Sequence, residues 1–560
     1  MSTSPRPQSA VTVVVIGYDD AGHVADAVRS ALAQGPAVRE VIAVDDCSTD
    51  GSAELLTRLA ATEPRLRVIR RPVNSGGCGT PRNTGMDAVA SPYVMFLDSD
   101  DVLAPGAVEA LLAAACAEGA QVASGLCVRR ELPSGREVPW QAPLYAARAV
   151  VERPALCPRL VRDTLCVNKL YAMGFLRAHG IRFPEGRFPY EDVVFTARVL
   201  AASPRIVLVP DRVYVWHVRR SAERLSISLD RAGVDNWRAR TRACRTAHAI
   251  LLAAGEKELA RATRGKFLDH ELRMYVRELG LHDAQYQRAW WEHTRAYLAE
   301  YDAADWERAP ASPGRLVGWV VLASPEPRDL PRLRELASRP ARLPPPYARA
   351  PDGTPVWSAD LPEVALEPLL TRPVGSLPLA VDAELRLHAR GARGGLPPRL
   401  RLRLRLHDLY GRLAEAGGPE AVEVAWRRRE DGRPGPCRTV AFRPAPERTG
   451  GAEGAGESVW SAETDVDLTA LAAPGAGTWD LFLRLRFRDG AHREVTAHAL
   501  TGAGLLRRRA LPSVRHGVLL VQPYATHSGA LALRVAPGVR GAVAVARRRL
   551  RRLLRRSRPA

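Results

Sequence analysis

The stretch VTVVVIGYDD, residues 11–20, opens with six consecutive β-branched residues and closes with two carboxylates. A run of this kind without alternating polar positions is typical of a strand buried on both faces of a parallel sheet. Strand-like runs and helical patterns then alternate along the chain: strands at 39–45, 66–70 and 93–97, helices at 22–34, 52–61 and 80–90. This alternation predicts βαβ units and an α/β sheet.

Carboxylates collect where these predicted strands end. Asp45 and Asp46 close one strand, and Asp98 and Asp100 follow another in the stretch VMFLDSDDVL, residues 94–103. In open α/β sheets, ligands bind at the carboxyl ends of the strands. Like charges at one rim suit a hard cation such as Mg²⁺ or Mn²⁺, which takes oxygen ligands and shares them with phosphates. A capped turn also explains a single Asp-x-Asp sequence. Further motifs are therefore needed to distinguish a cation site from a turn.

The composition restricts the class of protein. A single core stops growing at roughly 250–300 residues, so a chain of 560 residues predicts about two to four domains. The net charge of +20 and the sequence pI near 10.2 favour polyanionic partners. The codon bias of a high-GC genome, which enriches proteins in Arg, explains these values equally well. None of the eight cysteines has CxxC spacing, which predicts reduced thiols and neither a zinc site nor a redox motif.

The pattern changes after the α/β region. Helix formers dominate 234–305, prolines punctuate 310–355, and PRLRLRLRLHDL and GTWDLFLRLRFRDG alternate with period two, as in an antiparallel sandwich or barrel. We predict the following organisation: 1–10 disordered N-terminus, 11–232 α/β domain, 233–309 helical segment, 310–355 Pro-rich linker, 356–536 β-sandwich region of one or two modules, and 537–560 basic tail. Alternating Leu and Arg at 400–406 favours a solvated sheet face over a nucleic-acid groove.

The chain end is strongly basic. It carries nine Arg between Arg540 and Arg558, interleaved with apolar residues and without any acid. This predicts a basic amphipathic helix on an anionic membrane surface, and a disordered tail without function remains the alternative. The start MSTSPRPQSA lacks the apolar region of a signal peptide, and no uncharged apolar run is long enough to span a bilayer. We therefore expect a cytoplasmic protein, at most peripheral on the inner membrane face.

Three segments in order resemble the family 2 glycosyltransferases, which have the GT-A fold. They are VTVVVIGYDD (11–20), VIAVDDCSTDGSAELL (41–56) and NSGGCGTPRNTGMDAVASPYVMFLDSDD (74–101). The resemblance covers roughly residues 10–230. Gly17 and Asp19 stand where Pro and Asn are commoner in the family pattern, and Cys47 replaces Gly. These departures leave the base of the nucleotide less certain than the chemistry.

The resemblance implies a nucleotide-sugar donor, with a UDP-sugar expected, and a divalent metal, Mn²⁺ or Mg²⁺. It assigns roles at these positions: Gly17 and Tyr18 to the nucleoside pocket, Asp46 to the uracil imide, Arg82 to the nucleotide and its phosphates, Asp98 to the ribose or the metal, Ser99 to the nucleotide sugar, and Asp100 to the metal as its principal ligand. Asp101 is interpreted as a helix cap or an outer-shell group.

A second signature is FPYEDVVFTARVL, residues 188–200. The resemblance implies that Asp192 is the catalytic base, which takes the proton of an acceptor hydroxyl, and that Glu191 orients the acceptor or the base. A single base opposite the leaving diphosphate implies inversion of the anomeric centre. Acidic residues also favour the first turn of a helix, which is the structural alternative. In YVWHVRRSAERLSIS (214–228), His217 and Arg219 are expected to neutralise the diphosphate.

The layout of a GT-A domain, helices and a β-rich half resembles enzymes that glycosylate wall teichoic acid. The predicted acceptor is therefore a polyanionic polyol-phosphate polymer, which agrees with the basic charge. Another cell-surface polysaccharide or a lipid-linked acceptor is the alternative. Two alternatives belong to other classes: a basic nucleic-acid-binding protein and a non-catalytic adhesion protein. Aromatic residues make up only 6% of the chain and the tail has none, so nucleic acid is not expected.

Overall fold

The computed structural model of the chain describes these residues: 10–219, 231–307, 313–338, 341–366, 377–388, 399–408, 411–415, 417–445, 458–500, 508–513, 515–526 and 529–538. It forms two compact units, Met1–Phe267 with Glu300–Arg308, and Leu268–Ala299 with Ala309–Ala560. The predicted basic tail, 537–560, lies almost wholly outside the described residues. Among the described helices, none combines the length and apolarity needed to cross a membrane. All eight cysteines are free.

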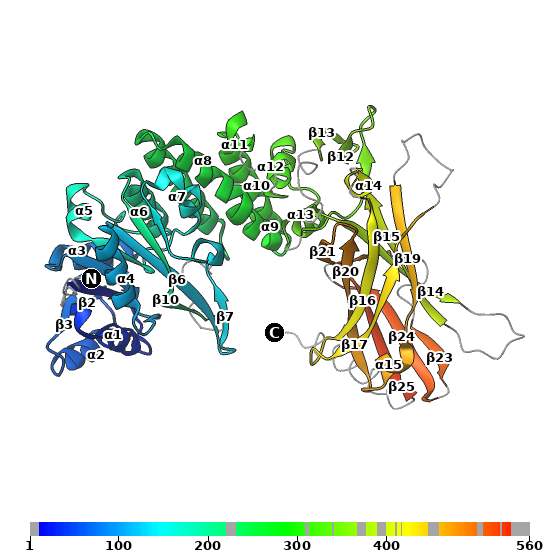
Figure 1. Ribbon diagram of the computed structural model, residues 1–560, viewed down its shortest axis with the longest axis horizontal. Helices are drawn as coiled ribbons and strands as arrows, with labels where there is room; N and C mark the ends of the chain where they lie inside the picture. Colours follow the sequence, from blue (N-terminus) through cyan, green and yellow to red (C-terminus); the bar gives the residue numbers. More distant parts are fainter. Residues whose placement is uncertain are drawn as a thin grey trace, which may run out of the picture. The chain divides into compact units, whose positions relative to one another are not determined.

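The first unit is built on one ten-stranded sheet (Figure 1). Its order is β3-β2-β1-β4-β9-β6-β10-β5, with β7 on β6 and β8 on β10. The strands are β1 (Val11–Gly17), β2 (Val38–Asp45), β3 (Leu66–Arg70), β4 (Tyr93–Asp98), β5 (Val102–Leu103), β6 (Val122–Leu132), β7 (Arg136–Pro139), β8 (Ala149–Val151), β9 (Lys169–Ala172) and β10 (Ile206–Arg219). The first four in this order are parallel, which confirms the α/β prediction.

Helices cover both faces of this sheet. They are α1 (Val24–Leu32), α2 (Ser52–Ala60), α3 (Gly79–Ala88), α4 (Ala107–Glu118), α5 (Met173–Ala178) and α6 (Glu191–Ala201). A Cβ on Gly85 of α3 would lie 2.3 Å from Val14, so α3 packs tightly on the face of β1 that Val14 occupies. Gly17 faces Val24 of α1 from the opposite side of the same strand. Because β1 pairs in parallel with β2 and with β4, the carboxyl ends of these three strands meet at one rim of the sheet.

Further helices follow the sheet. The first unit also contains α7 (Val234–Ala253), α8 (Lys257–Lys266) and α11 (Ala303–Glu307), although the sequence assigned 233–309 to a separate helical segment. The second unit contains α9 (Arg273–Leu279), α10 (Ala284–Leu298), α12 (Pro313–Ala323) and α13 (Leu330–Ala337). Helices α12 and α13 lie in the stretch predicted to be a linker, so that interpretation is wrong for 313–337. Their prolines stand in the first turn, where a proline costs no hydrogen bond.

The β-rich half has two mainly antiparallel sheets over one core, with one parallel pair between β14 and β22. The five-stranded sheet has the order β18-β19-β15-β14-β22, and the seven-stranded sheet β17-β16-β20-β25-β24-β23, with β21 on β20. The bounds are β14 (Ala380–His388), β15 (Arg399–Asp408), β16 (Pro419–Arg428), β17 (Pro434–Ala441), β18 (Arg443–Pro444), β19 (Ser458–Asp465), β20 (Gly477–Phe487), β21 (His492–Val495), β22 (His498–Ala499), β23 (Arg509–Ser513), β24 (Gly517–Ala525) and β25 (Leu531–Pro537). Both sheets contribute to one hydrophobic cluster, which favours a single sandwich over two modules.

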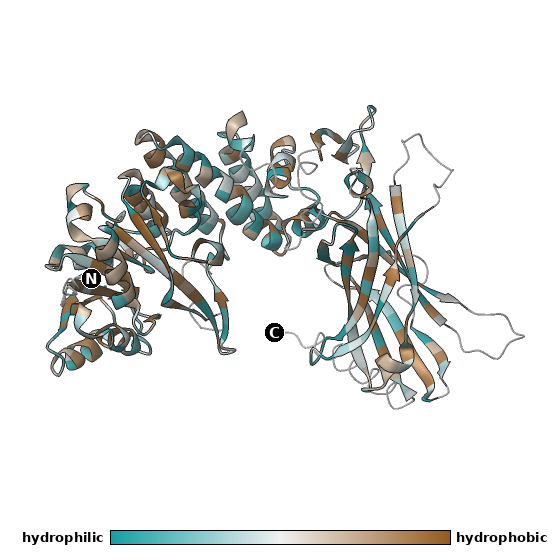
Figure 2. Cartoon of the chain, viewed as in Figure 1, coloured by the Kyte–Doolittle hydropathy of each residue, from teal (hydrophilic) through white to brown (hydrophobic). Residues whose placement is uncertain are grey.

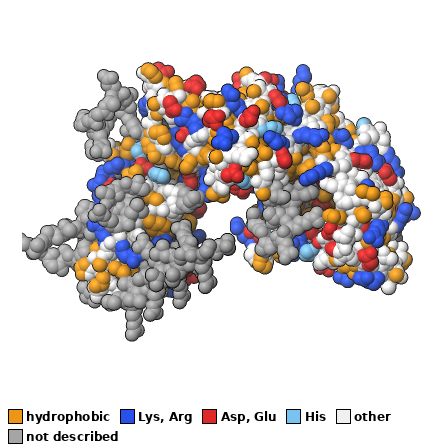
Figure 3. Space-filling view, turned by 180° about the vertical axis from the view of Figure 1, so that it is seen from behind, with side chains coloured by type: hydrophobic (Ala, Val, Ile, Leu, Met, Phe, Trp, Pro, Cys, Tyr) orange, Lys and Arg blue, Asp and Glu red, His pale blue; other side chains and the backbone are white. Residues whose placement is uncertain are grey.

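The period-two pattern is visible in the strands. Figure 2 shows hydrophilic and hydrophobic residues alternating along them. On β15 the leucines are buried, while Arg401 and Arg403 pair with Glu463 or Asp465 of β19, as expected for a solvated face. A separate small sheet of β11 (Ala348–Arg349), β12 (Pro355–Ser358) and β13 (Leu361–Ala365) precedes the sandwich. On the view in Figure 3, basic side chains are interspersed with acidic and apolar ones.

Candidate active site

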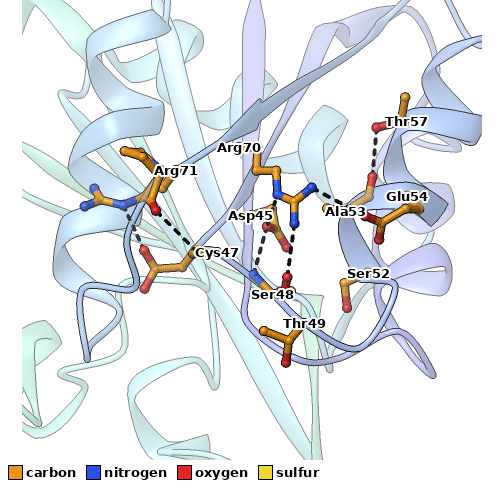
Figure 4. A network of polar contacts seen from close by, with 12 residues as sticks. Asp45, Cys47, Ser48, Thr49, Ser52, Ala53, Glu54, Thr57, Arg70 and Arg71 are labelled. Carbon is orange, nitrogen blue, oxygen red and sulfur yellow. Dashed lines mark hydrogen bonds and ion pairs between the residues drawn. The ribbon is translucent and has the colours of Figure 1, made fainter.

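The turn after β2 holds two buried carboxylates, each fixed by its own arginine. Asp45 accepts a hydrogen bond from the Ser48 amide at 3.0 Å, and Arg70 Nε lies 3.9 Å from it. Figure 4 shows the Arg70 guanidinium lying between Asp45, the Ser48 carbonyl and Glu54. This network holds the turn between β2 and α2.

Asp46 is also occupied by protein groups. Its Oδ1 lies 2.8 Å from Arg71 Nε, and its Oδ2 accepts hydrogen bonds from the Ser75 hydroxyl at 2.7 Å and from the Ser75 amide at 3.0 Å. Asn74 donates to its backbone oxygen. The expected contact with a uracil imide would have to share these partners, so that role stays a prediction.

The loop after β1 is fixed by side chains from the turn after β2 and from the β4 loop. The Asp19 amide donates to Ser48 Oγ at 2.9 Å, and Asp19 Oδ1 accepts from the Thr49 amide at 2.7 Å. The Ser99 hydroxyl donates to Asp20 at 2.8 Å. A Cβ on Gly17 would lie 2.9 Å from Ser99 Cβ, so only glycine allows this approach. Gly17 and Ser99 therefore lie together at the rim, and the roles of Gly17, Tyr18 and Ser99 toward a nucleotide stay predictions.

The loop after β4 crowds three carboxylates. Tyr214 of β10 donates to Asp101 at 2.7 Å, and so does the His217 amide. Arg219 donates to the Asp100 carbonyl at 2.9 Å and to its carboxylate at 3.2 Å. Burial, followed by the charges of Asp98 and Asp20, raises the pKa of Asp100 to about 6. Burial together with Asp100 and Asp98 also raises the pKa of Asp101 well above its ordinary value.

This loop has the character of a cation site. The side chains of Asp98 and Asp100 are 33% and 41% exposed, so both can reach a ligand. Within the described residues no group of three or more His, Cys, Asp or Glu side chains surrounds a metal position. Two accessible carboxylates fit Mg²⁺ or Mn²⁺ when phosphate oxygens complete the coordination. A divalent charge would offset the repulsion from Asp98 and Asp20, which adds to burial in raising the pKa of Asp100.

Arg82 of α3 joins this loop to the start of α6. Its side chain is only 4% exposed. One terminal nitrogen donates to Asp98 at 2.6 Å and the other to Glu191, which begins α6. The guanidinium also lies 5.3 Å from the ring centroid of Phe183. Arg82 thus uses both terminal nitrogens on protein carboxylates, and its predicted contact with phosphates stays a prediction.

The start of α6 presents the candidate base. Tyr190 precedes it with a φ of +66°, a left-handed conformation that turns the chain into the helix. Asp192 is half-buried, and its Oδ1 accepts the Val193 amide at 2.9 Å. Burial raises the pKa of Asp192, while Arg82, Lys266 and Arg240 counteract it. Burial also raises the pKa of Glu191 to about 7 against the opposing charge of Arg82.

Comparison with known proteins identifies the family of the domain that contains this site. Residues 12–173 match the model named Glycosyl transferase family 2. The first unit carries a family 2 glycosyltransferase domain. The chain is 31% identical over 230 residues to succinoglycan biosynthesis protein ExoO of Rhizobium meliloti, covering 39% of this chain and 64% of that protein.

Two further comparisons concern the poly(ribitol-phosphate) β-N-acetylglucosaminyltransferase TarS of Staphylococcus aureus. Its Mu50 sequence is 30% identical over 217 residues, which covers 38% of this chain and 36% of TarS. The chain thus aligns with less than two thirds of each of these relatives. The crystal structure of TarS matches with a TM-score of 0.51 at 18% identity, over 94% of this chain and 85% of the other. At that identity the likeness shows the fold alone.

Most predicted site residues lie at one rim of the sheet in the glycosyltransferase domain. The protonation of His217 differs from what its predicted contact with a diphosphate requires. His217 Nδ1 lies 3.0 Å from the Asp100 carbonyl, which can only accept, so this nitrogen carries the proton. Burial lowers the pKa of His217. The neutral ring then has no proton on Nε2 to offer a diphosphate, which favours a role in holding the loop.

Sequence reasoning missed the partners that fix the predicted residues. Arg71 and Ser75 hold Asp46, and Tyr214 holds Asp101. Ser75 lies in the motif NSGG, and this was the only feature of the sequence that could have indicated its contact with Asp46. Lys169 donates to Asp163 at 2.9 Å in a buried network.

Proposed function

We propose that this chain is an inverting glycosyltransferase that moves a sugar from a nucleotide-diphosphate sugar, with a UDP-sugar expected, to a hydroxyl of a polyol-phosphate polymer. One observation carries the proposal: Arg82 ties Asp98 of the donor-side loop to Glu191, which directly precedes the candidate base Asp192. Donor-side and acceptor-side acids are thereby held at one rim of the sheet.

Each side chain has a stated task in this reaction. Asp98 and Asp100 would hold Mn²⁺ or Mg²⁺, whose charge stabilises the departing diphosphate. Asp192 takes the proton of the acceptor hydroxyl while its oxygen attacks the anomeric carbon, and the bond to the diphosphate breaks on the opposite face. Because burial raises the pKa of Asp192, its carboxylate is a stronger base than an exposed aspartate.

The polymer acceptor rests on the relatives and on charge. TarS is named as acting on poly(ribitol-phosphate), and a net charge of +20 suits a polyanion. A second candidate acceptor is a polysaccharide without phosphates, which the similarity to a succinoglycan biosynthesis protein favours. A cytoplasmic location and an anionic membrane surface bound through 540–558 are further proposals, and that segment lies outside the described residues.

Transfer assays with UDP-sugars, Mn²⁺ and poly(ribitol phosphate) test the function. Asp192→Asn should lower the transfer rate by about 10²–10⁴-fold, the range of general base catalysis, while donor affinity stays unchanged. Asp87→Asn on the exposed part of α3 is the matched control and should transfer normally. Equal loss of donor affinity and transfer in Asp192→Asn would place the base elsewhere. Transfer to a phosphate-free glycan but not to the polymer would favour the second acceptor.

A further inference from the structure

The seven-stranded sheet has one face in the core and one in solvent. On β20, Leu481 and Leu483 are buried, while Phe482 and Arg484 point outward. Cross-strand partners share a face, so the strand pairing extends this outward surface to the neighbouring strands. The pairs Arg427–Asp480, Asp480–Ala532 and Ala532–Tyr524 form one row on this side of β16, β20, β25 and β24, in which Ala532 itself is fully buried. Four strands give this row a length of about 14 Å.

This surface, here called the outer arginine face, comprises Arg427, Arg429, Phe482, Arg484, Tyr524 and Arg534. Within the described part of the chain, Arg427, Arg484 and Arg534 have no carboxylate at ion-pair distance, whereas Arg429 Nε lies 3.0 Å from Asp480. The arginines of the five-stranded sheet differ, since Arg401 and Arg403 are paired with acids. The strand pairing also places Glu423 of β16 and Glu494 of β21 opposite Arg484. Among the described residues, Arg427 and Arg534 are therefore the arginines of the outer arginine face whose positive charge is least compensated.

Aromatic rings hold several of these guanidinium groups. Phe482 is 44% exposed, and the Arg427 guanidinium lies 4.7 Å from its ring centroid. Arg534 lies 4.5 Å and Arg429 5.9 Å from the Tyr524 ring centroid. A guanidinium stacked on a ring keeps its N–H edge free for an anion, and its orientation is already fixed before binding.

We propose that the outer arginine face binds the phosphodiester chain of the polymer acceptor. This rests on the proposed function for the identity of the polymer. Guanidinium groups bind phosphate oxygens in a forked geometry, and an exposed ring offers a surface to the C–H groups of a polyol. A symmetric contact between two copies would instead bring unpaired arginines against each other, which opposes self-association through this face. Holding the polymer here would raise the local concentration of its hydroxyls for successive transfers.

Binding of end-labelled poly(ribitol phosphate) to the full chain, followed by fluorescence anisotropy over a salt series, tests this proposal. The triple variant Arg427→Gln, Arg484→Gln, Arg534→Gln should bind about tenfold more weakly or worse at low salt, with the slope of log K against log salt reduced by about 2 for three lost phosphate contacts. Arg386→Gln, Arg401→Gln, Arg403→Gln is the matched control, because it removes the same charge from the other sheet. It should change affinity less than twofold.

Turnover separates this proposal from the proposed function. The triple variant should raise KM for the long polymer and leave donor hydrolysis and transfer to a single ribitol-phosphate unit unchanged. Equal loss in the control triple, or no loss in the face triple, overturns the proposal, as does a change in sedimentation of the face triple, which would mark an interface between copies. Equally tight binding of single-stranded DNA overturns the assignment to this polymer. If polymer binding follows prediction but no sugar is transferred, the proposed function fails alone.

Discussion

Two acidic turns lie at the same rim of one sheet and have opposite surroundings. After β2, Asp45 and Asp46 are almost fully buried, and Oδ2 of each accepts hydrogen bonds from protein groups, whereas Oδ1 of each has no hydrogen-bond partner, although that of Asp46 is ion-paired with Arg71. After β4, Asp98 and Asp100 are partly exposed and crowded, and the pKa of Asp100 rises to about 6. The first turn is a structural closure. The second turn pairs Asp98 with Arg82 and Asp100 with Arg219, but leaves both carboxylates exposed enough to reach a cation.

The largest expected difference between the two turns is the effect of their substitution on the transfer rate. Asp100→Asn should lower the transfer rate by about 10²–10³-fold, the range for loss of one group that stabilises charge at a transition state. Asp45→Asn should instead cost about 1–3 kcal/mol of unfolding free energy through its buried partners, with transfer nearly intact in the folded fraction. Parallel transfer assays and urea unfolding measure both. If the two variants lose activity equally, the turns do not differ in role.

Arg82 gives the largest expected effect on stability. Arg82→Gln leaves Glu191 buried without its cation, so the unfolding free energy should fall by about 3–5 kcal/mol in urea denaturation. Adding Glu191→Gln removes the orphaned charge and should restore part of that loss. A double variant that is no more stable than Arg82→Gln would show that this ion pair does not bridge the site.

Within the β2 turn, the two arginines should differ. The side chain of Arg71 is 20% exposed and that of Arg70 54%. Arg71→Gln should therefore cost about 1–3 kcal/mol and Arg70→Gln about 0–1 kcal/mol of unfolding free energy. Both remove one charge, so each controls for the other. A larger cost for Arg70→Gln would contradict the assignment of Asp46 as the more firmly held acid.

The smallest effect concerns pH. Because the folded-state pKa of Asp100 is raised, folding binds its proton more tightly, and the unfolding free energy without metal should fall as pH rises from about 4 to about 6. Asp100→Asn should flatten that fall slightly, since the side chain is 41% exposed and solvent screens it. Thermal unfolding in EDTA across this range measures it. An unchanged profile would show that the crowding has no energetic cost.

The sequence predicted what is local or periodic. β-branched runs predicted the sheet, period two predicted the β-rich half, and a quoted motif predicted the acids of the rim. It could not predict long-range partners such as Arg82 with Glu191, which lie 109 positions apart. Nor could it show that both sheets share one core, since alternation marks an inner face without saying what covers it. Cys47 has a φ of +65°, which explains why glycine is common there in the family pattern.

Prolines misled the prediction in one place. The stretch 310–355 was expected to be a linker, yet α12 buries Val317, Val320 and Val321 at helical spacing. Proline breaks a helix in its interior but not in its first turn. Whether a proline breaks the helix therefore depends on its position within the helix, which composition alone does not show.

Calorimetric titration of UDP-sugar into the wild-type protein and Asp100→Asn, each with Mn²⁺ and with EDTA, tests the central claim most directly. The account predicts that Mn²⁺ tightens donor binding at least about tenfold in the wild type and has no effect in Asp100→Asn, because the loop after β4 supplies the cation ligands. Equal tightening in both proteins, or none in the wild type, would contradict it.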